Sequence, residues 1–162
     1  RDWAHVGESG GREGGGRGGI EASIAMARFV VRGNSMEPIL EWGQHLLVSR
    51  LAYRIRKPAR DDLAIVRHPL RHGFLLVKRV VGIPGDNVRL EAGALVVNNI
   101  VVSTTHEVLQ SNAQWHLAGD EYFVSGDRTD GSTDSRAFGP VPRSLFLGKV
   151  RFPRGRGPGG RG

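Results

Sequence analysis

The chain contains no cysteine among its 162 residues. This absence excludes disulfides, thiolate metal sites and a cysteine nucleophile, and it leaves the redox compartment undecided. The sequence also predicts no membrane-spanning helix, because a span needs about 20 mostly apolar residues. The only apolar segment before Ser35, residues 20–31, is shorter than this and is interrupted by Glu21 and Arg28. No cleavable secretory signal is recognisable. We expect residues 20–31 to be an interfacial or frayed segment.

Recognisable metal sites are absent as well. The six histidines include no H-E-x-x-H pattern and no close pair with acidic partners, and His68 and His72 flank what looks like a loop. The acidic stretch 127–134 is not a calcium loop. If Gly131 is the glycine at position six of such a loop, position twelve falls on Ala137, where Glu is needed. We therefore expect no metal site and no catalytic histidine.

The charge of the chain is unevenly distributed. The formal net charge is +7, but residues 1–19 carry equal numbers of Arg and acidic residues, and residues 151–162 carry four Arg and no acid. The middle of the chain is therefore only mildly basic. Much of the high isoelectric point reflects a basic tail, so it says little about a nucleic-acid groove.

Glycine is abundant, with 24 residues that cluster at the two ends of the chain. Composition thus predicts three parts: a disordered Gly-rich segment 1–19, one domain over 20–153, and a disordered basic tail 154–162. The first segment is not a phosphate-binding loop, because no Gly-Lys-Ser/Thr follows it. The hydrophobic content of 39% and charged content of 24% are ordinary for a globular domain.

From residue 45 onward the pattern is that of short strands. Runs rich in Val, Ile and Leu are separated by turn-forming Pro, Gly, Asn and Asp. These runs occupy residues 45–48, 63–66, 74–81, 94–97, 100–102 and 145–152. Residues 20–31 fit either one face of a helix or, from Arg28, the start of a strand. We predict an all-β, compact, partly barrel-like antiparallel domain with disordered Gly/Arg-rich ends.

Two stretches suggest a serine nucleophile with a lysine base. Ser35 lies in G-N-S-M-E-P (33–38), where it could simply cap a helical turn that contains Pro38, and Lys78 could be a solvated charge on a half-buried strand. A lysine base must be neutral, which near pH 7–8 means lowering its pKa by roughly three units, or about 4 kcal/mol. Burial can do this, and Lys78 shares a strand face with Leu76 and Val80.

A third stretch makes the pattern specific. G-x-S-M-x-P around Ser35, K-R-V-V-G-I-P-G-D from Lys78, and G-D-x(3)-G-S-x-D-S-R from Gly126 to Arg136 resemble the three signature boxes of type I signal peptidases. The resemblance covers roughly residues 28–153, and it implies that the predicted antiparallel domain has the fold of this family. The first box alone would be weak evidence for this family, since self-cleaving repressors of the SOS type carry a similar motif.

The resemblance implies a role for each matching side chain. Ser35 would attack the scissile carbonyl, and Lys78 would act as general base and then as acid toward the leaving amine. Ser132 would orient the lysine. Asp134 and Arg136 would pair and hold their loop, since their i, i+2 spacing places them on one side of an extended segment.

The resemblance also implies a substrate site. The backbone N–H of Ser35 would form part of an oxyanion hole, and Gly33, Met36, Leu76 and Val77 would contribute to oxyanion and substrate binding. The substrate would lie extended, adding as a strand beside the segments that lead to Lys78 and to Gly33. Small pockets would then select Ala-x-Ala before the cut.

The implied activity is removal of N-terminal signal peptides from exported proteins by a serine endopeptidase, which would need no metal or organic cofactor. Its partners would be precursor proteins with Ala-x-Ala sites and a membrane surface, with no nucleic acid. Its location would be the extracytoplasmic face of the cytoplasmic membrane, although this chain holds no anchor. A dedicated maturation protease for one precursor is an alternative, and an RNA-binding module that uses the Arg-Gly tails is an alternative of a different class.

Several positions depart from the usual family pattern. Gly33 stands where some members have a Ser that helps the oxyanion hole, although other members have Gly. Gln44 and Asp61 replace an Asp and a Gly of common elements, and Arg128 and Gly131 stand where Asn is usual. The missing anchor affects the expected location more than the chemistry.

Overall fold

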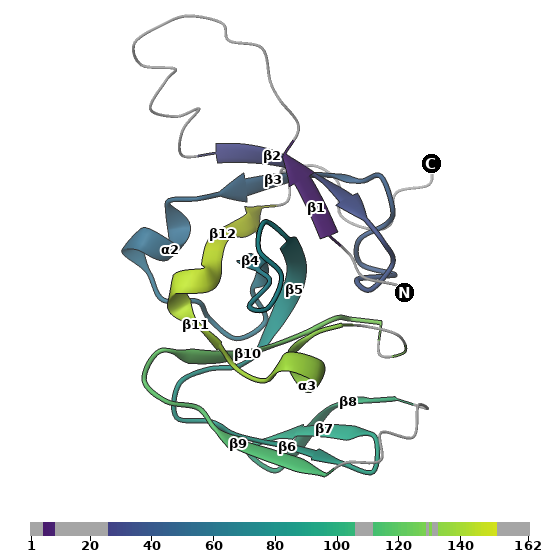
Figure 1. Ribbon diagram of the computed structural model, residues 1–162, viewed down its shortest axis with the longest axis vertical. Helices are drawn as coiled ribbons and strands as arrows, with labels where there is room; N and C mark the ends of the chain where they lie inside the picture. Colours follow the sequence, from purple (N-terminus) through teal and green to yellow (C-terminus); the bar gives the residue numbers. More distant parts are fainter. Residues whose placement is uncertain (1–4, 9–25, 106–111, 129, 131–132, 152–162) are drawn as a thin grey trace, which may run out of the picture.

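The computed structural model describes residues 5–8, 26–105, 112–128, 130 and 133–151. These residues form twelve strands, two short α-helices and one 3-10 turn (Figure 1). In chain order the elements are β1 (His5–Glu8), β2 (Met26–Arg32), β3 (His45–Ser49), α2 (Ala52–Ile55), β4 (Leu63–Arg67), β5 (Leu75–Gly82), β6 (Asn87–Glu91), β7 (Ala94–Val97), β8 (Ile100–Thr104), β9 (Ala113–His116), β10 (Glu121–Ser125), α3 (Ser135–Phe138), β11 (Val141–Pro142), η1 (Arg143–Leu145) and β12 (Phe146–Arg151).

The larger sheet has eight antiparallel strands in the order β1-β2-β3-β12-β4-β5-β10-β11. It curls until β1 also meets β5, where His5 pairs with Leu76. The sequence-based prediction of an all-β antiparallel fold is therefore confirmed. Because the β1–β5 contact consists of this one residue pair, the sheet is ring-like over part of its course and is not a barrel.

The smaller sheet has four strands in the order β8-β7-β6-β9 and forms a separate layer at the lower end of the molecule in Figure 1. Its β7–β8 hairpin turns at Asn98 and Asn99, which have φ of 49° and 67°. Asn tolerates this left-handed conformation, and two such residues give a turn whose twist matches the strands. The turn predicted at this Asn pair is thus present.

The hydrophobic core is divided among three clusters. One lies under β2, β3, β4 and β5, and it includes Met36 next to the predicted nucleophile. A second surrounds Tyr122. The third joins the small sheet to β10, and here a Cβ on Gly82 would come within 2.8 Å of Leu117 Cδ1 and 2.9 Å of Phe123 Cβ. Gly82 therefore lets the strand that carries Lys78 lie close to its neighbours.

The structure overturns one expectation for the N-terminal part of the chain and decides between two others. Within the segment predicted to be disordered, His5–Glu8 forms β1 and pairs with β2 over four residues. Within residues 20–31, the described part is strand β2, which resolves the choice between helix and strand. The last predicted strand begins at Phe146, and its predicted end at residue 152 lies outside the described residues, as does the tail 154–162.

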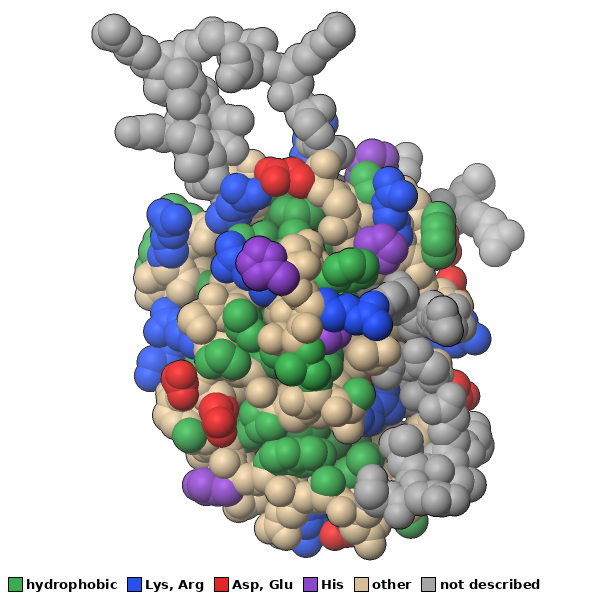
Figure 2. Space-filling view, in the orientation of Figure 1, with side chains coloured by type: hydrophobic (Ala, Val, Ile, Leu, Met, Phe, Trp, Pro, Cys, Tyr) green, Lys and Arg blue, Asp and Glu red, His purple; other side chains and the backbone are tan. Residues whose placement is uncertain are grey.

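No helix in the described part of the chain has the length and apolar character needed to span a membrane. The face shown in Figure 2 carries its Lys and Arg side chains scattered over the surface, and they do not gather into one basic groove. This distribution agrees with the mild net charge of the middle of the chain.

Candidate active site

Ser35 and Lys78 are in direct contact. The amine of Lys78 donates a hydrogen bond to the Ser35 hydroxyl, with 2.9 Å between Nζ and Oγ. Both residues are buried, with exposed fractions of 0% for Lys78 and 1% for Ser35. A general base has to lie about 2.6–3.2 Å from the group whose proton it removes, so this geometry suits proton transfer.

Ser35 owes its position to a tight turn after β2. Before the turn, Val31 exchanges backbone hydrogen bonds with Gln44 and Gly43, at 2.9 and 2.8 Å. Gly33 then leaves the strand direction with φ of 103°, a conformation that residues with a Cβ rarely adopt. The side chain of Met36 is fully buried in the core, so the residue after Ser35 anchors the turn.

Lys78 lies in a dry part of β5. Leu76, Val77, Lys78 and Val80 are all fully buried, and Lys78 pairs with Ala64 of the neighbouring strand. Burial on both faces of the sheet excludes the interpretation of Lys78 as a solvated strand charge.

This burial sets the protonation of the amine. Loss of hydration lowers the pKa of Lys78 from 10.5 to about 8; Asp134 and Asp127 oppose the shift, and the positive charge of Arg136 favours it. An amine with this pKa is neutral in a substantial fraction of molecules near pH 7–8. It can therefore accept a proton, which an ordinary lysine rarely can at this pH.

The third box forms a buried ion pair behind the lysine. Arg136 binds both carboxylate oxygens of Asp134, with Nε–Oδ1 and Nη2–Oδ2 distances of 3.0 and 2.8 Å. The backbone N–H of Gly126 donates to the same carboxylate at 2.9 Å. Burial alone raises the pKa of Asp134, but the hydrogen bonds and charge of Arg136 outweigh burial and hold this pKa below its ordinary value. The carboxylate is therefore ionised, and it links the backbone at Gly126 to the side chain of Arg136.

The reason expected for this pairing was wrong. Asp134 and Arg136 do not lie on an extended segment. Instead, Asp134 is the N-cap of α3, and its Oδ1 accepts the backbone N–H of Arg136 at 3.0 Å. Asp is a favoured N-cap because its side chain satisfies an otherwise unpaired N–H of the first helical turn.

The remaining sequence-predicted site residues have different positions. Met36 and Val77 lie in one buried cluster, Leu76 lies on β5 where this strand meets β1, and Gly33 is in the turn before Ser35. Ser132 lies outside the described residues. The structure thus brings together Ser35, Lys78, Asp134 and Arg136, in addition to the residues that surround them.

One contact near the site was not anticipated from the sequence. Arg79 forms a bidentate ion pair with Asp127, with both N–O distances at 2.7 Å. The backbone N–H of Arg128 also donates to the carbonyl of Ser35 at 2.9 Å. These bonds connect all three boxes. Arg79 directly follows Lys78 and Asp127 is the second residue of the third box, but their contact depends on β10 lying beside β5.

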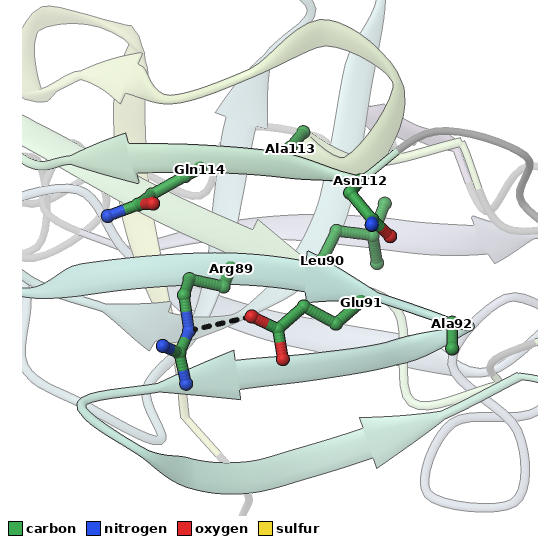
Figure 3. Close-up of a pocket in the computed structure, with 7 residues that line it drawn as sticks. All are labelled: Arg89, Leu90, Glu91, Ala92, Asn112, Ala113 and Gln114. Atoms are coloured by element: carbon green, nitrogen blue, oxygen red, sulfur yellow. Dashed lines mark ion pairs between the residues drawn. The ribbon is translucent and has the colours of Figure 1, made fainter.

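A shallow pocket of about 470 Å³ lies elsewhere, on β6 and β9 of the small sheet (Figure 3). The Arg89–Glu91 ion pair forms part of its lining, at 3.2 Å. None of its lining residues belongs to the three boxes. Within the described residues, no group of three or more His, Asp or Glu side chains could hold a metal ion.

Comparison with known proteins identifies the family. The family model described as signal peptidase, peptidase S26, matches residues 19–154. A probable signal peptidase I-2 of Synechocystis sp. is 32% identical in an alignment of 145 residues that covers 83% of this chain and 66% of that protein. A signal peptidase I of Leptolyngbya laminosa is 32% identical in an alignment of 149 residues that covers 83% of this chain and 71% of that protein.

A solved structure is also similar. A crystal structure of a signal peptidase I from Enterococcus faecalis is 26% identical, with a TM-score of 0.48, and the match covers 59% of this chain and 98% of that chain. The present chain spans about two thirds of the length of the two curated relatives, 66% and 71%. The family model covers most of the chain, and the chain belongs to the signal peptidase family, peptidase S26.

Proposed function

We propose that the chain is a serine endopeptidase of the signal peptidase I type, which removes N-terminal signal peptides from exported precursor proteins. The observation that carries this proposal is the 2.9 Å hydrogen bond between the buried Lys78 amine and the buried Ser35 hydroxyl. Membership of the signal peptidase family supports the substrate class.

In the proposed reaction, neutral Lys78 takes the proton of Ser35 as Oγ attacks the scissile carbonyl carbon. The tetrahedral intermediate collapses when the Lys78 ammonium gives its proton to the leaving amine, and the signal peptide remains as an ester on Ser35. Water then attacks this ester while Lys78 again accepts a proton. Lys78 returns that proton to Oγ, which releases the signal peptide and restores the enzyme.

The neighbouring groups are assigned supporting roles. The backbone N–H of Ser35 stabilises the oxyanion. Gly33 has no side chain, so this position adds no side-chain donor to the oxyanion hole. Asp134 and Arg136 fix the loop behind the amine, and Asp127 fixes Arg79, the residue after the base. Ser132 orients the Lys78 amine.

The proposed substrate lies as an extended strand between β2 and β5, with the bond to be cut at Ser35. Residues before the cut then face the buried cluster that contains Phe29, Val31, Met36 and Val77. Little room remains beside these side chains, which favours Ala at the alternate positions that point inward and so gives an Ala-x-Ala preference.

A peptide containing Ala-x-Ala tests the proposal. The wild-type chain should cut it after the second Ala, whereas Ser35→Ala and Lys78→Ala should each lower kcat by at least about 10³-fold, because each removes a group that acts in the same step. Ser144→Ala and Lys57→Ala are matched controls at exposed positions and should cut at the wild-type rate. Retained cleavage in the Ser35→Ala or Lys78→Ala variant would overturn the proposal, as would cleavage after an unrelated sequence.

We further propose that the enzyme works at a membrane surface on the extracytoplasmic side of the cytoplasmic membrane. The loop that follows Ser35 exposes two large apolar side chains, Trp42 at 69% and Ile39 at 48%. Trp favours the membrane–water interface, where its ring is apolar and its N–H stays hydrated. Trp42→Ala should weaken binding to phospholipid vesicles in a sedimentation assay while cleavage of a soluble peptide is unchanged. Equal vesicle binding by both proteins would count against this role.

A further inference from the structure

The strand site proposed for the substrate is already occupied by the chain's own β1. Residues His5–Glu8 pair with β2, in a register that places Val6 opposite Val31, and His5 also pairs with Leu76 of β5. β1 is therefore the strand that lies between β2 and β5 near the dyad (Figure 1).

The strand edges involved can take only one partner at a time. β2 uses its other edge for β3, and β5 uses its other edge for β4. On the shared side, β5 pairs with β10 from Arg79 onward and with β1 at Leu76. A substrate strand that needs the same backbone N–H and C=O groups must displace β1.

The side chains of β1 hold it in place at three points. Val6 is 5% exposed and belongs to the buried cluster that contains Met36 and Val77. The His5 ring lies against Phe74, with ring centroids 5.8 Å apart. At the other end, Glu8 forms an ion pair with Arg50 at 2.7 Å. Val6 thus takes the place proposed for an inward-pointing substrate residue.

The direction of β1 is opposite to that of the proposed substrate. Residues before the cut lie along β2, and the bond to be cut lies at Ser35, beyond the C-terminal end of β2. Their chain must therefore run parallel to β2. β1 runs antiparallel to both β2 and β5, so its N-terminal residue, His5, is the one nearest the end that leads to Ser35. β1 therefore fills the groove in the direction opposite to that of a substrate.

We propose that β1 is an autoinhibitory strand, which occupies the substrate groove in reverse and must leave before a precursor can bind. The inference rests on the proposed function, since it concerns entry to the same site. The strand is only four residues long and its Glu8–Arg50 pair is largely solvated, with side-chain exposures of 58% and 36%. Release of β1 by a competing peptide is therefore feasible.

The expected kinetic effect follows from the fraction of molecules with an open groove. If β1 is docked in nine of ten molecules, the apparent KM is about tenfold higher than that of the open groove, and kcat is unchanged. Val6→Glu in the full chain places a charge in the buried position of Val6 and should lower KM by up to about tenfold. Val101→Glu makes the same change at a side chain that is 58% exposed on β8, and it should leave KM unchanged.

A charge exchange provides a second test that leaves the core untouched. Glu8→Arg and Arg50→Glu should each lower KM about twofold, because each replaces the attraction at the end of β1 by repulsion. The double variant restores an opposite pair and should restore the wild-type KM. A purely structural effect of either substitution would not be reversed by the other.

A third measurement does not require catalysis. In the Ser35→Ala chain, an uncut Ala-x-Ala peptide that enters the groove should speed amide hydrogen exchange of residues 6–8 as its concentration rises, because these residues lose their partner strand. The same peptide should leave exchange in β6 and β7 unchanged.

The outcomes separate the two proposals. Cleavage with the same KM in wild type, Val6→Glu and the charge variants overturns the autoinhibitory role and leaves the peptidase assignment intact. Peptide binding without faster amide exchange at residues 6–8 would also overturn the autoinhibitory role and leave the peptidase assignment intact. Absence of cleavage by every variant, including Val6→Glu, overturns the peptidase assignment and with it the competition for the groove.

Discussion

The pH dependence of cleavage is the most direct test of the Ser35–Lys78 arrangement. Because burial lowers the pKa of Lys78 to about 8, kcat/KM should rise tenfold per pH unit below this value and level off above it. The assay is hydrolysis of an Ala-x-Ala peptide without titratable side chains, measured between pH 6 and 10.

The size of the effect follows from the shift. Moving the pKa from 10.5 to about 8 corresponds to about 3 kcal/mol at roughly 1.36 kcal/mol per unit. At pH 7 about a tenth of the Lys78 amines are then neutral, roughly 300-fold more than for an unperturbed lysine. This enrichment in free base is the contribution of burial to the rate.

A physical titration provides the control for this profile. In the Ser35→Ala chain, the NMR signal of the Lys78 ε-carbon should titrate near the pH at which wild-type activity reaches half its plateau. A rising limb near pH 10.5 would show that the amine is solvated during catalysis, and a limb near 6.5 would indicate histidine. Either result would refute the assignment of Lys78 as a base activated by burial.

Three further predictions concern stability, measured by urea unfolding. Lys78→Met should be inactive and more stable than wild type by up to about 3 kcal/mol below pH 8. This difference should shrink between pH 8 and 10.5, because in this range the folded wild type has lost the Lys proton while its unfolded state still binds it, so the stability of wild type alone rises with pH. A pH-independent difference would contradict this reasoning. Gly148→Ala should cost about 1–3 kcal/mol, because its Cβ would lie 2.7 Å from Val48 Cγ1 and 2.8 Å from the carbonyl oxygen of the next residue in that strand, and wild-type stability would show that β3 can move aside. Tyr53→Phe should cost about 1–2 kcal/mol with unchanged kcat/KM, since it removes only the 3.1 Å hydrogen bond to the buried Asp62 carboxylate; a loss of activity would show that this pair acts on the site.

Local sequence patterns predicted strands β3, β4, β5, β7, β8 and β12, but they gave no prediction for β6, β9, β10 or β11. A run rich in Val and Leu marks the strand of Lys78, and the Asn98–Asn99 pair marks the turn of the β7–β8 hairpin. The strand period also placed Leu76 and Val80 on the same face as Lys78. The full burial of Val77 on the opposite face, however, depends on packing between distant strands. Full burial of the amine, and hence the size of its pKa shift, could not follow from the sequence around it.

The N-terminal strand had no comparable signal. Residues 5–8 contain one valine beside a glycine-rich stretch, so their strand conformation comes from pairing with β2 rather than from propensity. The same pairing decides that residues 26–32 are a strand, where the local pattern allowed a helix.

The third box shows an avoidable error. Asp134 was expected on an extended segment, but it precedes four residues of helix that end at Gly139, whose φ is 79°. Asp before a short segment closed by Gly is a capping pattern that the sequence displays. The Asp127–Arg79 pair, by contrast, depends on β10 lying beside β5, which no local pattern encodes.

The dryness of the Lys78 amine also makes the integrity of the fold and the reactivity of the enzyme inseparable. The pKa of the amine stays lowered only while β5 is enclosed by β4 on one edge and by β10 on the other. Any opening that admits water there returns the proton to the amine and disarms the hydroxyl at the same moment. A partly unfolded chain should therefore lose the free base that activates Ser35, so hydrolysis should depend on distant segments of the chain enclosing that amine together.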